Sequence, residues 1–350
     1  MKSNPFLGKT LSNRYLIQQE IGSGGFASVF KAKDIQKNKT VAVKILANES
    51  NTNTDEKREE RFVREARLHL QHPNIVQIFE LNHHEAPPYT YIAMELLCGH
   101  DLRKELEENG PIHPPRCIDF IIQALEALDT AHQKNIVHRD LKPENLFIHT
   151  TKRKDEIIKV LDFGIAWMHT EHTLSLTGQI LGTHKYLAPE YIQDNVISSK
   201  LDIYQMGLVL VELLTGTPVV HTDHAMTGFR QHIRGSIEIP IALLESSLGP
   251  IILQALHNDH TQRFASASQF AQALSSIDTN HIPTGEELKE KIALNTYQKW
   301  KSILEMSSED NAIEKEHHPT APVQSSQNKL LSIFVLATIS IVIGFTFAML

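Results

Sequence analysis

The chain has only two cysteines among its 350 residues, and this scarcity limits the class of protein to which it can belong. Cys98 and Cys117 have neither the spacing of a zinc site nor the number that a disulfide framework requires, so they fit a reducing cytoplasm. An apolar run is also missing after the first five residues, Met1 to Pro5. A secretory signal is therefore not predicted.

Positive charge is not in excess either. The chain has 34 Lys and Arg against 41 Asp and Glu, a formal net charge of −7, which gives no sign of a nucleic-acid-binding surface. We therefore expect no nucleic-acid partner. Histidine is abundant, with 20 residues, but the pairs His83-His84 and His317-His318 lack convincing ligand spacing. No metal site is predicted from them.

The most informative stretch runs from His138 to Asn145 and reads HRDLKPEN. Further along, Asp162 begins the triplet DFG. These segments supply an acidic residue for the attacking hydroxyl, a lysine for a phosphoryl group and two oxygen ligands for a metal, which is the set that phosphoryl transfer needs. Taken singly, Asp140 and Asn145 are also typical of ordinary turns. Their combined spacing argues against that reading.

With these motifs in this order, the chain resembles a eukaryotic-like (Hanks-type) serine/threonine protein kinase, of the membrane-anchored kind found in bacteria, over residues 12–277. The resemblance implies an α+β fold with a small β-rich N-lobe (12–97) and a larger helical C-lobe (98–277). It implies catalytic roles for Asp140 and Lys142. Asn145 and Asp162 would bind Mg²⁺, or Mn²⁺ in its place, beside ATP. A lysine at position 142 is typical of the serine/threonine class, so protein hydroxyls are the expected substrates.

The nucleotide would lie under a glycine-rich hairpin and against the strand that ends in Lys44. Glycine lets the backbone approach phosphates closely, but a lone glycine cluster is more often a simple turn. Ala27 departs from the family pattern, which has a third glycine there. The residues expected to contact ATP are Ile21, Gly22, Ser23, Gly24, Gly25, Phe26, Ala27, Ser28, Val29, Ala42, Lys44, Glu65, Glu95, Leu97 and Asp101.

Three of these assignments have particular grounds. Glu65 is the best candidate for a helix-borne partner of Lys44, although Glu56, Glu59 and Glu60 lie nearby. Backbone groups of Glu95 and Leu97 would bind the adenine edge, following Met94 at the gatekeeper position. Asp101 would reach the ribose, or would only cap the helix that begins near Leu102.

Residues 165–186 would form the activation segment, which is rich in hydroxyl groups. Arg139 immediately precedes the catalytic aspartate, and a buried arginine there needs an anion, which a phosphate on this segment would supply. Ser175 and Thr177 are the predicted phosphorylation sites. The alternative is a solvated loop without regulation. In the C-lobe, Asp202 would brace the catalytic loop, and Arg263 would pair with Glu190.

The C-terminal part divides into three further segments. Residues 278–306 are predicted to form one amphipathic helix, and residues 307–329 a polar, disordered linker. Residues 330–350 contain no charge and at about 1.5 Å per residue span roughly 31 Å, close to the thickness of a bilayer core. We therefore expect a single-pass C-terminal membrane anchor, with no external sensor domain beyond it and with the kinase domain on the cytoplasmic side. Tethered copies would self-associate and phosphorylate one another.

Two other classes of function remain open at this point. A pseudokinase would bind nucleotide without transfer, but it usually lacks a residue equivalent to Lys44, Asp140, Asn145 or Asp162, and all four are present. A nonenzymatic membrane adaptor would use the same lobe only as a docking surface.

Overall fold

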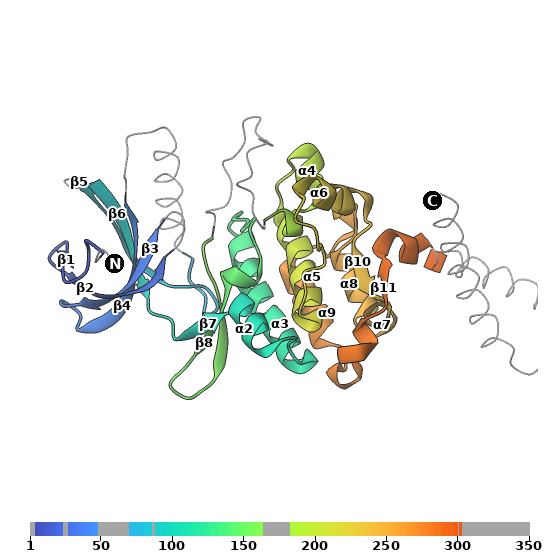
Figure 1. Ribbon diagram of the computed structural model, residues 1–350, viewed down its shortest axis with the longest axis horizontal. Helices are drawn as coiled ribbons and strands as arrows, with labels where there is room; N and C mark the ends of the chain where they lie inside the picture. Colours follow the sequence, from blue (N-terminus) through green and yellow to red (C-terminus); the bar gives the residue numbers. More distant parts are fainter. Residues whose placement is uncertain are drawn as a thin grey trace, which may run out of the picture. The chain divides into compact units, whose positions relative to one another are not determined.

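The computed structural model describes residues 4–23, 27–47, 70–85, 88–163, 183–299 and 301–302. The chain separates into two compact units, Met1–Gln298 and Lys299–Leu350. The first unit contains a sheet of six strands at one end and a group of helices at the other (Figure 1). This is the predicted arrangement of a β-rich N-lobe and a helical C-lobe.

The sheet of the N-lobe is antiparallel throughout, with the strand order β1-β2-β3-β4-β6-β5. It consists of β1 (Thr10–Leu11), β2 (Tyr15–Ser23), β3 (Ser28–Asp34), β4 (Lys39–Ala47), β5 (Ile78–Glu85) and β6 (Pro88–Glu95). Along β4, Val41, Val43 and Ile45 point to one face, so Ala42 and Lys44 point to the other. This alternation separates the structural face of the sheet from the face that carries the predicted nucleotide residues.

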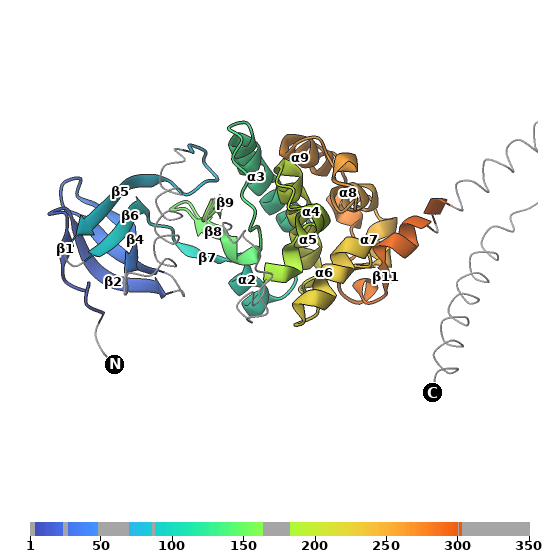
Figure 2. The ribbon, with the colours of Figure 1, turned by 90° about the horizontal axis from the view of Figure 1, so that it is seen from above.

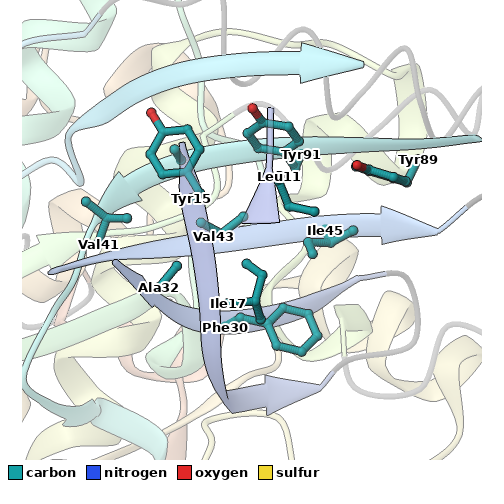
Figure 3. Packing of buried hydrophobic residues seen from close by; sticks show 11 residues of the cluster. Leu11, Tyr15, Ile17, Phe30, Ala32, Val41, Val43, Ile45, Tyr89 and Tyr91 are labelled. Carbon is teal, nitrogen blue, oxygen red and sulfur yellow. The ribbon is translucent and has the colours of Figure 1, made fainter. Parts of the chain in front are cut away.

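The structural face forms the core of the N-lobe (Figure 3). Phe6, which precedes the first strand, packs edge-on against Phe30 and Tyr89, with ring centroids 6.1 and 5.3 Å apart. Residues before position 12 therefore belong to the folded lobe. The buried members of this cluster are Leu11, Tyr15, Ile17, Phe30, Ala32, Val41, Val43, Ile45, Tyr89, Tyr91 and Ala93.

A small antiparallel sheet lies between the six-stranded sheet and most of the helices (Figure 2). Its strands are β7 (Gly99–Asp101), β8 (Leu146–Thr150) and β9 (Glu156–Val160). The 3-10 helix η1 (Pro143–Asn145) leads into β8, and Asp162 follows β9. The HRDLKPEN motif thus ends immediately before β8, and the DFG motif begins just after β9, so the pairing of these two strands brings the motifs close together.

The C-lobe is built around α5 (Ser199–Thr215), in which every residue from Leu201 to Leu214 is buried. A helix that is covered on all sides lies in the centre of a domain. The helix α3 (Pro114–His132) packs against both α5 and α9 (Ala267–Ser275). The other helices are α2 (Leu102–Asn109), α4 (Pro189–Asp194), α6 (Ala225–Arg234), α7 (Ile241–Glu245) and α8 (Gly249–Ala255), with the 3-10 helices η2 (Thr183–Tyr186) and η3 (His260–Gln262).

The prediction that residues 278–306 form one helix is wrong over residues 279–293, whereas residues 294–299 and 301–302 are helical and residues 303–306 lie outside the described residues. This stretch contains the 3-10 helices η4 (Thr279–His281) and η5 (Gly285–Leu288) and the strand β11 (Lys291–Ala293), which pairs antiparallel with β10 (Glu238–Pro240). The apolar side chains of Leu288, Leu294 and Tyr297 are buried. Tyr297 Oη donates to the carbonyl oxygen of Leu244 on α7, and the N–H of Leu294 donates to that of Ile237, so the packed chain extends beyond residue 277.

The predicted membrane anchor at 330–350 lies outside the described residues. Among the residues that the structure describes, no helix combines the length and the apolar character needed to cross a bilayer.

Removing the chain after Ile277 should destabilise the folded unit. The shortened variant lacks β11 and the buried side chains of Leu288, Leu294 and Tyr297, each worth about 1.5–3 kcal/mol when fully buried. We expect the free energy of unfolding to fall by at least about 3 kcal/mol. Urea denaturation of this variant beside one that ends at Gln298 measures the difference. Equal midpoints and equal slopes for the two variants would contradict the assignment.

Candidate active site

The catalytic loop, residues 133–142, is held by the buried carboxylate of Asp202 in the first turn of α5. Asp202 accepts hydrogen bonds from the backbone N–H groups of His138 and Arg139, each at 2.8 Å, and from Nε2 of His132 at 2.7 Å. Arg139 has a φ of 72°, a left-handed conformation that is costly for a residue with a side chain. The hydrogen bonds of Asp202 stabilise this backbone, which confirms the predicted brace.

Asp140 lies at the centre of a cluster made by the HRDLKPEN motif. Lys142 Nζ donates to Asp140 Oδ2 at 2.9 Å. Asn145 Nδ2 donates to the carbonyl oxygen of Asp140 at 2.6 Å and to Oδ2 at 3.1 Å. The Asp140 side chain remains 20% exposed, so a hydroxyl group from outside can reach its carboxylate. The structure therefore brings both predicted catalytic residues together with a predicted metal ligand.

The segment that follows β9 brings the second metal ligand close to the first. Leu161 N–H donates to the carbonyl oxygen of Asn145 at 2.9 Å, and His138 Nε2 donates to the carbonyl oxygen of Leu161 at 2.8 Å. The His138 ring also packs edge-on against Phe163, with centroids 4.9 Å apart. Asp162, between Leu161 and Phe163, is thus fixed from both sides, and it also has a left-handed φ of 55°.

Lys44 joins the N-lobe to this ligand. Its Nζ lies 2.6 Å from Oδ1 of Asp162, and the two side chains are 12% and 42% exposed. Lys44 is opposite Val29 on β3 and opposite Ile92 on β6, so neighbours on both sides fix its position in the sheet. The predicted partner Glu65 lies outside the described residues.

Other residues expected to contact the nucleotide lie on the same sheet near Lys44. Ala42 is opposite Met94, and Ala27 packs on a small cluster formed by Leu46 and Ile92. The alanine in place of a glycine is therefore also an apolar contact of the sheet. Gly22 pairs with Val29 and Ser23 with Ser28 at the described ends of the hairpin, and Ile21 is exposed. Its tip, Gly24 to Phe26, lies outside the described residues.

The connector between the lobes is fixed by an ion pair that sequence reasoning missed. Lys159 Nζ on β9 lies 2.6 Å from Glu95 Oε1, which also accepts the backbone N–H of Gln77 at 2.8 Å. Both charged side chains are mostly buried, at 10% and 23% exposed. A single lysine within the otherwise apolar run Ile157 to Val160 is the signal that could have pointed to this pair. Leu97 lies in the connector between β6 and β7.

Asp101 caps α2, which was one of its two predicted roles. Its Oδ1 accepts the N–H of Lys104 at 2.9 Å, and its backbone is extended, as is usual for the residue before a helix. The ribose contact stays a prediction.

A second polar network, also missed, connects α5 with α2 and η1. Glu212 is fully buried and accepts hydrogen bonds from Tyr186 Oη at 2.6 Å and from Arg103 Nη2 at 2.8 Å. Arg103 Nε also donates to Glu144 at 3.2 Å. Burial raises the pKa of Glu212 and, together with the neighbouring carboxylate, raises the pKa of Tyr186 far above its usual value. Tyr186 therefore stays protonated and fixes the segment that enters α4.

The predicted pair of Arg263 and Glu190 is confirmed. The guanidinium nitrogens Nη1 and Nη2 each lie 2.8 Å from one carboxylate oxygen of Glu190, a bidentate arrangement in which both side chains are buried. Arg263 also lies over the ring of Tyr204, 4.5 Å from its centroid. This pair anchors the start of α4 to the C-lobe.

The donor set fits a nucleotide with a divalent cation. Asn145 uses its amide nitrogen for Asp140, and its carboxamide oxygen and the Asp162 carboxylate are the hard oxygen donors that Mg²⁺ prefers. In the described ranges, no group of three or more His, Cys, Asp and Glu side chains could hold a metal by itself. Phosphate oxygens would therefore complete the coordination. The predicted phosphorylation sites Ser175 and Thr177 lie outside the described residues.

Comparison with known proteins agrees with this geometry. The family described as protein kinase domain matches residues 15–291. The chain is 36% identical to serine/threonine-protein kinase PrkC of Bacillus subtilis over 284 residues, which are 79% of this chain and 42% of that protein. It is 34% identical to serine/threonine-protein kinase PknB of Mycolicibacterium smegmatis over 282 residues, which are 78% of this chain and 44% of that protein.

A third relative is serine/threonine-protein kinase pkn3 of Myxococcus xanthus, at 32% identity over 288 residues, 79% of this chain and 52% of that protein. The chain thus spans about half, or less, of the length of these relatives. The match ends at residue 291 rather than at the predicted 277, as β11 also indicates. On these matches and on the site geometry, the chain belongs to the Hanks-type serine/threonine protein kinase family.

Proposed function

We propose that this chain is an ATP-dependent serine/threonine protein kinase that transfers the γ-phosphate of ATP to hydroxyl groups of proteins. The observation that carries the proposal is the cluster of Asp140, Lys142 and Asn145 beside the Lys44–Asp162 pair. The names of its relatives, which are serine/threonine-protein kinases, support the class of acceptor.

Each residue of the cluster has a separate task in this reaction. Asp140 orients the acceptor hydroxyl and accepts its proton, and its partly exposed carboxylate can be reached by such a group. Lys142 neutralises charge on the phosphoryl group being transferred, and Lys44 binds the phosphates that stay with the nucleotide. Asn145 and Asp162 would hold Mg²⁺, which neutralises phosphate charge when it is bound.

Labelled ATP and Mg²⁺ test the proposal directly. We expect the full chain to incorporate label on serine or threonine, either in itself or in casein. Replacing Asp140 by Asn should lower the rate about 10²–10⁴-fold because the acceptor hydroxyl loses its base. Replacing Asp162 by Asn should abolish metal-dependent nucleotide binding as well.

Asp155→Asn is the matched control, since Asp155 is an exposed carboxylate in the turn between β8 and β9 and should leave the rate unchanged. ATP binding without any transfer by the parent chain would show a pseudokinase instead. If the Asp140→Asn variant replaces the parent chain in cells without any loss of function, this would favour a nonenzymatic adaptor.

We also propose that phosphorylation of Ser175 or Thr177 activates the kinase. Arg139 supports this proposal because its Nε is buried and has no hydrogen-bond partner among the described residues. A buried guanidinium nitrogen without a partner is costly, and a phosphate group would supply bidentate acceptors. Copies held close together would phosphorylate one another in trans.

Phosphopeptide mapping after incubation with ATP tests this step. We expect phosphate on Ser175 or Thr177 and a rate of incorporation per chain that rises with protein concentration. The double variant Ser175→Ala, Thr177→Ala should lose most of the activation, whereas Thr151→Ala, which removes a hydroxyl from the turn between β8 and β9, should keep it. A phosphorylated chain with no modification between residues 165 and 183 would contradict the proposal.

Residues 330–350 are proposed to anchor the chain in a membrane, with the kinase domain on the cytoplasmic face. Their lack of charge and their length support this placement. In fractionated cells that express the full chain, we expect it in the membrane pellet and resistant to carbonate extraction. A variant that ends at Lys329 should move to the supernatant. A full chain found in the supernatant would contradict the anchor.

A further inference from the structure

Gln205 is a fully buried glutamine one turn after Asp202 on α5. Its Oε1 accepts the backbone N–H of Leu141 at 3.0 Å. Its Nε2 donates to the carbonyl oxygens of Arg139 and Tyr186, each at 3.1 Å. All three bonds go to backbone groups, and none goes to another side chain.

Two of these bonds enclose the catalytic residue. Arg139 and Leu141 are the neighbours of Asp140 on either side, and Arg139 is also held through its N–H by Asp202. The N–H of Asp140 lies 3.3 Å from His138 Nδ1, and its carbonyl oxygen accepts from Asn145. The peptide groups flanking Asp140 are therefore bonded to α5, while its carboxylate faces outward.

The third bond reaches a different part of the chain. Tyr186 ends η2, and it is followed within a few residues by α4, which the Glu190–Arg263 pair anchors. One carboxamide thus joins the catalytic loop to the segment that enters α4. These three bonds need one acceptor and two donor hydrogens on one planar side-chain group. Among side chains, only a carboxamide supplies this combination.

We propose that Gln205 is a positioning residue for phosphoryl transfer, which fixes Asp140 relative to the segment that ends at Tyr186. The inference rests on the proposed kinase activity. Gln205 contacts neither Lys44 nor Asp162 in the bonds described, so its role concerns the acceptor hydroxyl and its base rather than the nucleotide. Misplacing a reacting group by about 1 Å can lower a rate about 10²-fold.

The test uses the full chain with Gln205→Met and Gln205→Glu, labelled ATP and casein. Met has a similar length and removes all three bonds. We expect kcat to fall about 10–100-fold, while the dissociation constant for ADP with Mg²⁺ stays within about twofold of the parent value.

Gln123→Met is the matched control. Gln123 also accepts a backbone N–H through its carboxamide, that of Ile158 at 2.8 Å, and its other described hydrogen bonds go to the side chains of Asn74 and Asp119, outside the catalytic loop. Its variant measures what the loss of a carboxamide costs the fold, and we expect its kcat to stay within about twofold of the parent value.

The Gln205→Glu variant distinguishes a positioning role of Gln205 from a purely structural one. It also tests the proposal if the Gln205→Met variant does not fold. Ionised Glu keeps the acceptor for Leu141 but places negative charge against two carbonyl oxygens, whereas protonated Glu donates to one of them. We therefore expect the ratio of its kcat to that of the parent to rise as the pH falls from 8 to about 5.5.

The outcomes distinguish this inference from the proposed function. A parent chain that transfers no label would remove the kinase activity itself. If the parent chain is active, any of three results would overturn the role of Gln205 alone. These are a kcat for Gln205→Met equal to that of the Gln123→Met control, a loss of ADP binding that parallels the loss of kcat, or a kcat ratio for Gln205→Glu that does not change with pH.

Discussion

The burial of every residue of α5 from Leu201 to Leu214 is the constraint on which the rest of the C-lobe depends. A helix covered on all sides cannot leave polar side chains without partners, because a buried polar group without a hydrogen bond is costly. Apart from Tyr204, its buried polar residues are Asp202, Gln205 and Glu212. Each of them forms hydrogen bonds with a segment that surrounds the site. The helix that forms the core therefore also determines where the catalytic loop lies.

The active site is assembled from segments whose local conformations are unfavourable by themselves. Arg139 and Asp162 both have positive φ, which residues with side chains rarely adopt. At Arg139, the hydrogen bond from its N–H to Asp202 offsets the cost of this conformation. At Asp162, the neighbouring residues offset it, because His138 holds both Leu161 and Phe163. The strained backbone at these two residues is thus stabilised by contacts that other residues make.

Sequence reasoning recovered the residues whose roles depend on local spacing. The group in HRDLKPEN lies within one short loop, so Asp140, Lys142 and Asn145 were found together, and the brace by Asp202 and the pair of Arg263 with Glu190 followed from the resemblance. Gln205 and the Lys159–Glu95 pair were missed because their partners are far away in the sequence. The strand β11 was missed since three residues are too few to show alternation, and the charged residues before it favoured a helix.

The chain leaves the kinase unit immediately after a segment that is attached to the end of α6. Asn295 binds the carbonyl oxygens of Gly235, through its N–H at 2.9 Å, and of Arg234, through its side chain at 2.9 Å. A mechanical load applied to the chain beyond Gln298 would act first on the buried side chain of Tyr297, whose Oη donates to the carbonyl oxygen of Leu244 at 3.3 Å, and then on the two bonds of Asn295 and on the pairing of β10 with β11. Tension in the following segment therefore enters the catalytic unit through Tyr297 and, beyond it, through the C-terminal end of α6.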